Sequence, residues 1–163
     1  MRYVRQRDQY SCGPIAIMNA LKWAGLSATY RTHFHKIRSL CKTTMSWGTT
    51  PKNMTVTLEK YSKCLSFTTK SLVTLKEIDK HLAAGGAVIL EYWFLDDEMG
   101  YYDGHYVFVF REREHNFIIV NAIDVPVTYP CSRDMLKSIL SCKKYRHTGS
   151  PSAWFLIKRG KCE

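Results

Sequence analysis

The sequence predicts a single α+β domain, residues 1–163, with helices in its first part and an antiparallel sheet in its second part. Three observations support this expectation. A chain of 163 residues is long enough for one domain with a real hydrophobic core, and too short for two of comfortable size. Amphipathic segments of helical length dominate the residues before 65. Short apolar segments with polar connections follow after residue 86, as in neighbouring antiparallel strands.

The expected helices are recognised by their start and stop residues. Pro14 lies in the first turn of the first helix, and Gly25 follows its last turn. The sequence Thr74-Leu-Lys-Glu77 is a capping box that starts the fourth helix, which ends at Gly85. The expected helices cover about 12–24, 30–41, 50–61, 74–85 and 132–144.

The expected strands are short runs rich in β-branched and aromatic residues. The runs 87–94 and 105–110 are joined by an acidic connection, 95–104. The other expected strands cover 65–69, 117–120 and 153–158. Because helices precede most of the strands, we expect the first helix to pack against the antiparallel sheet.

The net charge of +10 is unevenly distributed along the chain. Residues 31–63 and 133–163 each sum to +6, whereas residues 91–114 sum to −5. Basic segments attract nucleic acid, an acidic protein or a membrane surface, although they also serve solubility alone. Because no nucleic-acid-binding motif accompanies the charge, nucleic acid is only a secondary candidate partner. No apolar run is long enough to span a membrane, and we expect no membrane partner.

The cysteines and histidines indicate neither a disulfide framework nor a metal site. The six cysteines are widely spaced and no secretory signal precedes them, so we expect mostly free thiols in a cytoplasmic protein. His33 and His35 would face apart on a helix, which argues against a zinc site with Cys41. We therefore expect no metal and no cofactor.

Cys12 lies where a loop turns into a helix, six residues after Gln6. A helix start offers unpaired backbone N–H groups and the positive end of the helix dipole. Both favour the thiolate, which is the nucleophilic form of cysteine. The side chain of Gln6 can donate a hydrogen bond to an oxyanion, with Gln9 as a nearby competitor. This stretch therefore indicates nucleophilic catalysis.

His105 is the candidate general base, because it opens a predicted strand directly after Asp103-Gly104. An imidazole base needs an acceptor that orients its second ring nitrogen. Asn121 ends the next predicted strand, sixteen residues later, so a hairpin can bring it beside His105. Asp124, three residues further, is the alternative. Strand pairing favours Asn121, whereas the strength of a carboxylate–imidazolium bond favours Asp124.

Four short motifs resemble the pattern of the papain-like cysteine peptidase superfamily: Gln6, Ser11-Cys12-Gly13-Pro14, Gly104-His105-Tyr106 and Val120-Asn121. The sequence is most similar to the C39-like peptidases, which process bacteriocin leaders. The resemblance covers residues 6–124 and implies a papain-like fold, with the nucleophile helix on the sheet. It implies that Cys12 is the nucleophile, His105 the base and Gln6 the oxyanion donor. Asn121 or Asp124 would orient the base.

The resemblance implies hydrolysis of a peptide or isopeptide bond through a thioester on Cys12. C39-like relatives often cut after small residues such as Gly-Gly, so the expected partner is a peptide or a protein with a Gly-Gly-containing or ubiquitin-like tail. Two alternatives stay open. One is acyl transfer to an amine, as in transglutaminase-like enzymes and acyltransferases of the same fold. The other is a catalytically inactive module that binds nucleic acid or an acidic protein.

Overall fold

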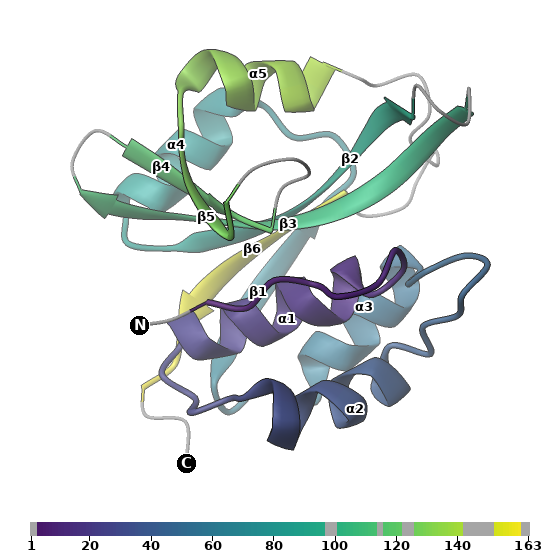
Figure 1. Cartoon of the computed structure of the whole chain (residues 1–163). Helices are drawn as coiled ribbons and strands as arrows, with labels where there is room; N and C mark the ends of the chain where they lie inside the picture. Colours follow the sequence, from purple (N-terminus) through teal and green to yellow (C-terminus); the bar gives the residue numbers. More distant parts are fainter. Residues whose placement is uncertain (1–2, 97–100, 114–115, 122–125, 142–151, 161–163) are drawn as a thin grey trace.

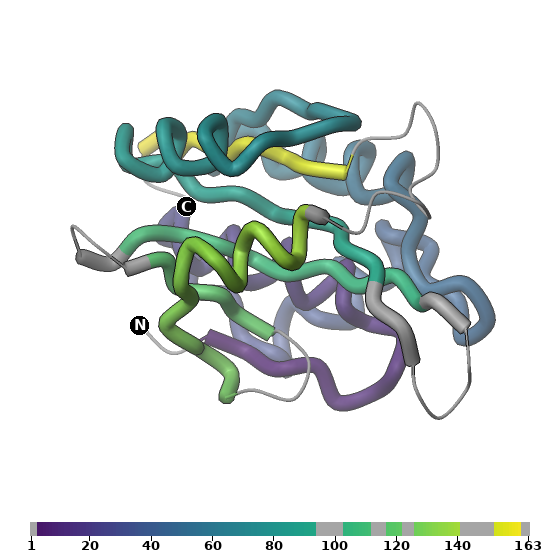
Figure 2. The backbone as a smooth tube through the Cα atoms, turned by 90° about the horizontal axis from the view of Figure 1, so that it is seen from above, coloured from purple at the N-terminus to yellow at the C-terminus, as the bar shows by residue number. Residues whose placement is uncertain are grey.

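A computed structural model of the chain describes residues 3–96, 101–113, 116–121, 126–141 and 152–160. These residues form a six-stranded sheet with a helical layer on each face (Figure 1 and Figure 2). The described helices are α1 (Cys12–Trp23), α2 (Tyr30–Leu40), α3 (Pro51–Glu59), α4 (Leu75–Ala83) and α5 (Arg133–Ser141). The described strands are β1 (Leu65–Lys70), β2 (Ala87–Asp96), β3 (Tyr101–Arg113), β4 (Asn116–Val120), β5 (Thr128–Cys131) and β6 (Ala153–Lys158). Within these ranges, no helix has the length and apolar character needed to cross a membrane.

The sheet has the strand order β1-β6-β2-β3-β4-β5, and each neighbouring pair is antiparallel. The long hairpin of β2 and β3 lies at its centre and pairs Tyr92 with His105. Val120, the last residue of β4, lies opposite Phe108 of β3. β4 therefore ends before it reaches the level of His105, which leaves this edge of β3 accessible to other parts of the chain.

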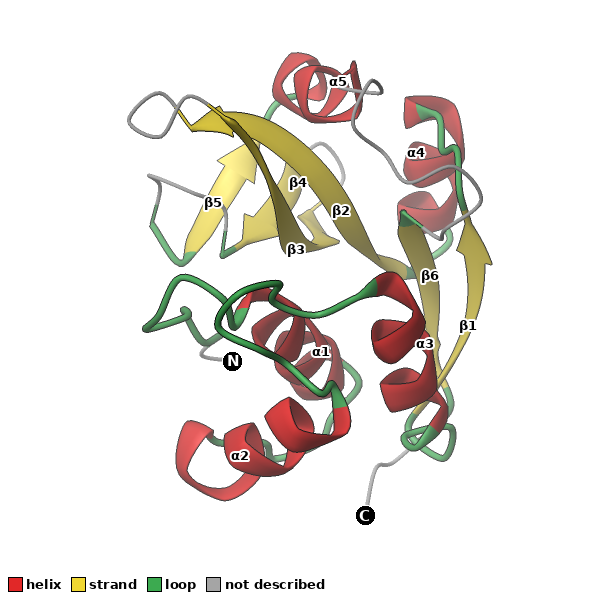
Figure 3. Ribbon diagram, turned by 90° about the vertical axis from the view of Figure 1, so that its right-hand side faces the viewer, coloured by secondary structure: helices red, strands yellow, loops and turns green. Residues whose placement is uncertain are grey.

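The sheet separates two hydrophobic cores, as Figure 3 shows with α1, α2 and α3 on one face and α4 and α5 on the other. Along β3, Tyr106 and Phe108 contribute to the core that contains α1. Val107 and Val109 contribute to the core that contains α4 and α5. This alternation follows from the two-residue period of a strand. α1 is buried along almost its whole length, so the rest of its layer and the sheet hold it from all sides.

The structure confirms the α+β fold with an antiparallel sheet, and each predicted helix is present within three residues of its expected ends. Two strand predictions were wrong. Strand β5 was not predicted, because it has only four residues and contains Pro130, which weakens the pattern of a strand. Residues 95–96 and 101–104 were assigned to a connection but belong to β2 and β3, so the central hairpin is longer than expected.

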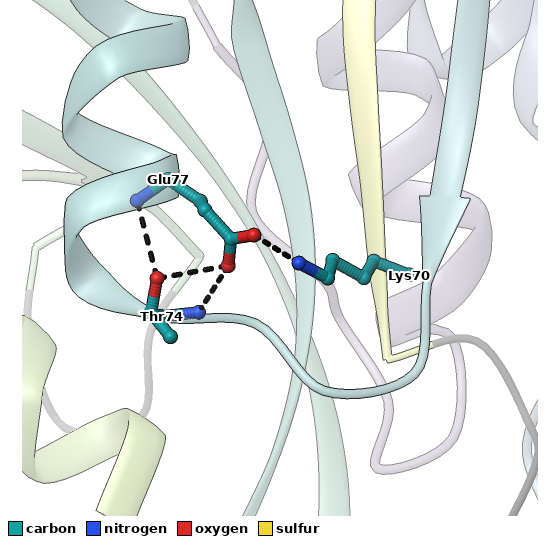
Figure 4. A network of polar contacts seen from close by, with 3 residues as sticks. All are labelled: Lys70, Thr74 and Glu77. Carbon is teal, nitrogen blue, oxygen red and sulfur yellow. Dashed lines mark hydrogen bonds and ion pairs between the residues drawn. The ribbon is translucent and has the colours of Figure 1, made fainter.

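The capping box at the start of α4 is confirmed (Figure 4). The Thr74 hydroxyl accepts the Glu77 N–H at 3.3 Å, and the Glu77 carboxylate accepts the Thr74 N–H at 2.9 Å. Lys70 of β1 forms an ion pair with the same carboxylate. Hydrogen bonds from Lys70 and Thr74 lower the pKa of Glu77 to about 2. These contacts tie α4 to β1, the edge strand of the sheet.

The cysteines behave in two ways. Cys12, Cys41 and Cys131 are free and buried, in agreement with the expectation of mostly free thiols. Cys64, directly before β1, is disulfide-bonded, and its partner lies outside the described residues. The expectation of free thiols is therefore wrong for Cys64. The spacing of the cysteines in the sequence could not predict this disulfide, because a bond between distant cysteines depends on how the fold brings their Cα atoms together.

Candidate active site

The loop before Cys12 is shaped by one carboxylate. Asp8 accepts the backbone N–H groups of Tyr10 and Ser11 at 3.1 and 2.7 Å, and the Ser11 hydroxyl at 2.8 Å. Because an Asx side chain that bonds the next backbone N–H groups closes a turn, Asp8 reverses the chain just before α1. Cys12 is the first residue of α1 and is 5 % exposed.

A close approach fixes the start of α1 against the segment before α3. A Cβ atom on Gly13 would lie 2.8 Å from the Thr49 Cβ, so glycine is the residue that fits at this position. The single O–H of Tyr106 is shared between two acceptors, the Thr49 carbonyl oxygen at 3.0 Å and a Glu91 carboxylate oxygen at 3.2 Å. Thr49 thus connects the start of α1 to β3. This contact was not predicted from the sequence, although Glu91 is the one charged residue inside the predicted apolar strand 87–94.

The backbone N–H of Tyr106, the neighbour of His105, lies near the Cys12 sulfur and lowers the pKa of this thiol. The direction of this N–H follows from the sheet. Glu91, opposite Tyr106, donates its own N–H to Ser152 on the other side of β2. Glu91 and Tyr106 therefore form a non-hydrogen-bonded pair of the antiparallel ladder. The backbone N–H of Tyr106 points away from β2. It reaches Cys12 at the edge of β3 that β4 leaves uncovered.

His105 is oriented by a backbone carbonyl. Its Nε2 lies 2.6 Å from the Asn121 carbonyl oxygen, and its ring meets the Tyr92 ring edge-on at 5.6 Å. A carbonyl oxygen only accepts hydrogen bonds, so Nε2 carries the proton and Nδ1 of the neutral ring is the basic nitrogen. Asn121 has a φ of 65°, a left-handed conformation that asparagine tolerates better than most residues. Asn121 therefore contacts the imidazole through its main chain, not through its amide.

The Asn121 amide binds Gln6 instead. Its Oδ1 accepts the Gln6 backbone N–H, and its Nδ2 donates to Gln6 Oε1, both at 2.9 Å. Gln6 Nε2 donates one hydrogen bond to the Asp8 carbonyl at 2.8 Å. A side-chain amide nitrogen carries two hydrogens. The second N–H of Gln6 is therefore the candidate donor of a hydrogen bond to an oxyanion.

Four of the five predicted site residues lie in the described part of the chain. Gln6, Asn121 and His105 are linked by direct hydrogen bonds, and the Cys12 sulfur lies near the backbone N–H of Tyr106, the residue after His105. The fifth, Asp124, lies outside the described residues. Among the described residues, no group of three or more metal-binding side chains is close enough to hold an ion.

Burial keeps both reactive groups neutral in this structure. It raises the pKa of the Cys12 thiol to about 11, against smaller lowering effects from the N–H groups of Tyr106, Gly13 and Cys12. Burial also lowers the pKa of His105, while its bond to Asn121 and the nearby Asp103 charge oppose this shift. The expected lowering of the thiol pKa by the N–H groups at the helix start is present, but desolvation outweighs it, so the net shift is upward.

No described protein family and no curated protein matches the sequence of this chain. Solved structures do match its fold. A protein described as a C39-like peptidase from Bacillus anthracis superposes with a TM-score of 0.64 at 13 % identity, covering 98 % of this chain and 96 % of its own. The peptidase domain of Streptococcus ComA, a bifunctional ABC transporter of a quorum-sensing pathway, gives 0.63 at 16 % identity, with coverages of 95 % and 96 %.

A third match is a double-glycine-motif protease from an AMS/PCAT transporter, solved in complex with its leader peptide. It has a TM-score of 0.59 at 12 % identity and covers 96 % of this chain and 90 % of its own. At these identities the likeness concerns the fold. The chain therefore has the α+β fold of C39-like peptidases over almost its whole length, as its sequence motifs predicted.

Proposed function

We propose that this chain is a cysteine peptidase that uses Cys12 as its nucleophile. The observation that carries the proposal is the hydrogen-bonded set of Gln6, His105 and Asn121 around the segment that contacts the Cys12 sulfur. These residues come from three distant parts of the sequence. The fold of C39-like peptidases supports the same reading.

The first step is attack on the substrate carbonyl. His105 Nδ1 takes the thiol proton, and the sulfur of Cys12 forms a bond to the carbonyl carbon. The oxygen becomes negatively charged and accepts hydrogen bonds from the backbone N–H of Cys12 and the second N–H of Gln6. The Asn121 carbonyl holds Nε2–H throughout and stabilises the imidazolium that forms.

The second step breaks the amide. The protonated His105 gives its proton to the leaving nitrogen, the C–N bond breaks, and a thioester remains on Cys12. Water then attacks the thioester, His105 takes a proton from that water, and the acid product leaves with the thiol restored. Because both groups are neutral in the described state, substrate binding must promote the proton transfer from Cys12 to His105.

One structural neighbour supports the substrate class that we propose. It acts on a double-glycine motif and was solved with a leader peptide. For this chain we propose a peptide substrate that is cut after a Gly-Gly pair. No observation at the site favours a ubiquitin-like tail or a nucleic acid. The cytoplasmic location stays a prediction, as do acyl transfer and an inactive binding module as alternatives.

The proposal is tested with the purified chain and a mixture of peptides that carry Gly-Gly at varied positions, read by mass spectrometry. We expect cleavage after Gly-Gly, its loss in Cys12→Ala, and its retention in Cys131→Ala, a matched control at a free buried cysteine on the other face of the sheet. Cleavage that survives Cys12→Ala would contradict the assignment. Added amine that appears in the product would favour acyl transfer.

A further inference from the structure

Most of the net positive charge of the chain lies in its first 64 residues, which include the helical layer on one face of the sheet. The first 64 residues, which form the N-terminal loop and α1 to α3, contain eleven lysines and arginines and two acidic residues. The remaining 99 residues contain thirteen lysines and arginines and twelve acidic residues. The loop that leads to Cys12 belongs to the basic part. A ligand that approaches Cys12 from this layer therefore meets a strongly positive surface.

Two arginines in this layer are held by aromatic rings. The Arg7 guanidinium lies 4.5 Å from the centre of the Tyr30 ring, and the Arg38 guanidinium lies 4.9 Å from the centre of the Tyr10 ring. Arg7 and Tyr10 are on the loop before Cys12, whereas Tyr30 and Arg38 are on α2. Each element thus supplies one cation and one ring. We call these four residues the arginine strip.

The arginine strip is an electrostatic unit beside the catalytic loop. The pKa of Tyr30 is raised by burial and by Asp8, and lowered by Arg7 and Arg38, so all these charges lie near one ring. The Asp8 carboxylate is engaged by the backbone of Tyr10 and by Ser11. Among the described residues, the ion pairs are Lys70–Glu77 and Arg133–Asp79, so neither arginine of the strip forms an ion pair with a described carboxylate.

We propose that the arginine strip binds acidic side chains of the peptide substrate. This inference rests on the proposed peptidase function. A guanidinium stacked on a ring keeps its N–H edges exposed and its plane fixed, which suits two-pronged binding of a carboxylate. Arg7 directly follows Gln6, and Tyr10 lies two residues before Cys12, so the strip and the proposed nucleophile share one loop, and we expect a peptide bound at Cys12 to reach the strip. The preferred substrate therefore carries aspartate or glutamate near its cleavage site.

The test compares two peptides that differ only in charge. From the cleaved peptides of the mixture, one with a glutamate near the cut is paired with the same peptide carrying glutamine. We expect wild-type KM to be lower for the glutamate peptide. Arg7→Gln and Arg38→Gln should each raise KM for it about tenfold, the worth of a hydrogen bond to a charged group, with kcat unchanged. Neither variant should change KM for the glutamine peptide.

Lys60→Gln is the matched control, because Lys60 is an exposed cation of the same layer outside the strip. We expect it to leave the preference for the glutamate peptide intact. An equal loss for both peptides would show that the cation–π contacts only hold the loop in place, and would overturn the proposal. An equal effect of Lys60→Gln would also overturn it, because it would reduce the preference to overall charge.

Binding separates this inference from the peptidase proposal. Fluorescence anisotropy of the labelled glutamate and glutamine peptides with Cys12→Ala needs no cleavage. If the wild-type chain cleaves nothing, the peptidase proposal fails, and arginine-dependent binding of the glutamate peptide would still support acid recognition by the strip. Equal binding of both peptides would overturn it. Tighter arginine-dependent binding of a short RNA than of the glutamate peptide would overturn it in favour of nucleic acid.

Discussion

The starts of α1 and α4 use their backbone N–H groups differently. Thr74 and Glu77 close the start of α4 with a complete capping box at the surface. At the start of α1, Ser11 makes no side-chain cap, and the N–H groups of Cys12 and Gly13 face the sulfur instead. The first arrangement stabilises a helix, whereas the second leaves polar groups directed at a reactive atom. The start of α4 thus stabilises its helix, whereas the start of α1 directs its backbone N–H groups at the proposed nucleophile.

The largest loss of activity that we predict comes from replacing His105, the proposed general base for Cys12 at the start of α1. His105→Ala should lower kcat for a Gly-Gly peptide by about 10²–10⁴-fold, because general base catalysis is lost. Tyr92→Phe, which keeps the ring beside the imidazole, is the control and should keep most of the activity. Steady-state kinetics measures both. Near-normal kcat in His105→Ala would mean that the described site is not catalytic.

The next effect concerns the reactivity of the buried thiol. A pKa of about 11 in place of the usual 9 means that Cys12 in the free protein should react with iodoacetamide about a hundredfold more slowly at pH 8 than the same cysteine in an unfolded peptide. Because the folded-state pKa is raised, the associated stability is present below pH 9 and is lost as pH rises towards 11. Rates measured by peptide mapping test this. Fast labelling at pH 8 would show an open, thiolate-bearing site.

A smaller effect is expected from filling the space at Gly13. Gly13→Ala places a Cβ against Thr49, and should lower the free energy of unfolding by about 1–3 kcal/mol and reduce activity by shifting Cys12. Adding Thr49→Gly removes the two closest atoms, the Thr49 Cβ and Oγ1, and should restore part of both the stability and the activity. Urea unfolding and peptide kinetics measure the changes. A fully stable and active Gly13→Ala would contradict the close approach.

The smallest effect belongs to α4. Thr74→Ala should lower the free energy of unfolding by about 1 kcal/mol, the usual worth of an N-cap side chain. Peptide cleavage should be unchanged, since the capping box lies far along the chain from the Cys12 loop and on the other face of the sheet. Loss of kcat in this variant, with the protein still folded, would break the separation between the two helix ends.

Much of the fold and site could be predicted from local signals. Proline, glycine and capping residues mark helix ends, so the helices were predicted closely. The pairing of consecutive strands placed Asn121 beside His105. The use of the Asn121 carbonyl could not be foreseen, because it depends on a left-handed φ of 65°. Nor could the contact of Tyr106 with Thr49 and Glu91, which depends on packing between segments that are distant in sequence.

The pKa of the Cys12 thiol likewise depends on packing that local sequence does not determine. The sequence identifies a helix start, and the structure confirms that its N–H groups lower the thiol pKa. How deeply the sulfur is buried is set by α1, β3 and the loop together, and this decides the sign of the shift. Local sequence therefore predicted Cys12 as the nucleophile, but it could not predict that burial raises the pKa of this thiol.

The most direct test of the central claim is covalent trapping of the nucleophile. A peptide ending in Gly-Gly with a C-terminal vinyl methyl ester is incubated with the folded chain, and the product is digested and mapped by mass spectrometry. We predict one adduct, on Cys12, which is strongly reduced in His105→Ala. An adduct on Cys41 or Cys131 in place of Cys12, or no adduct at all, would contradict the account.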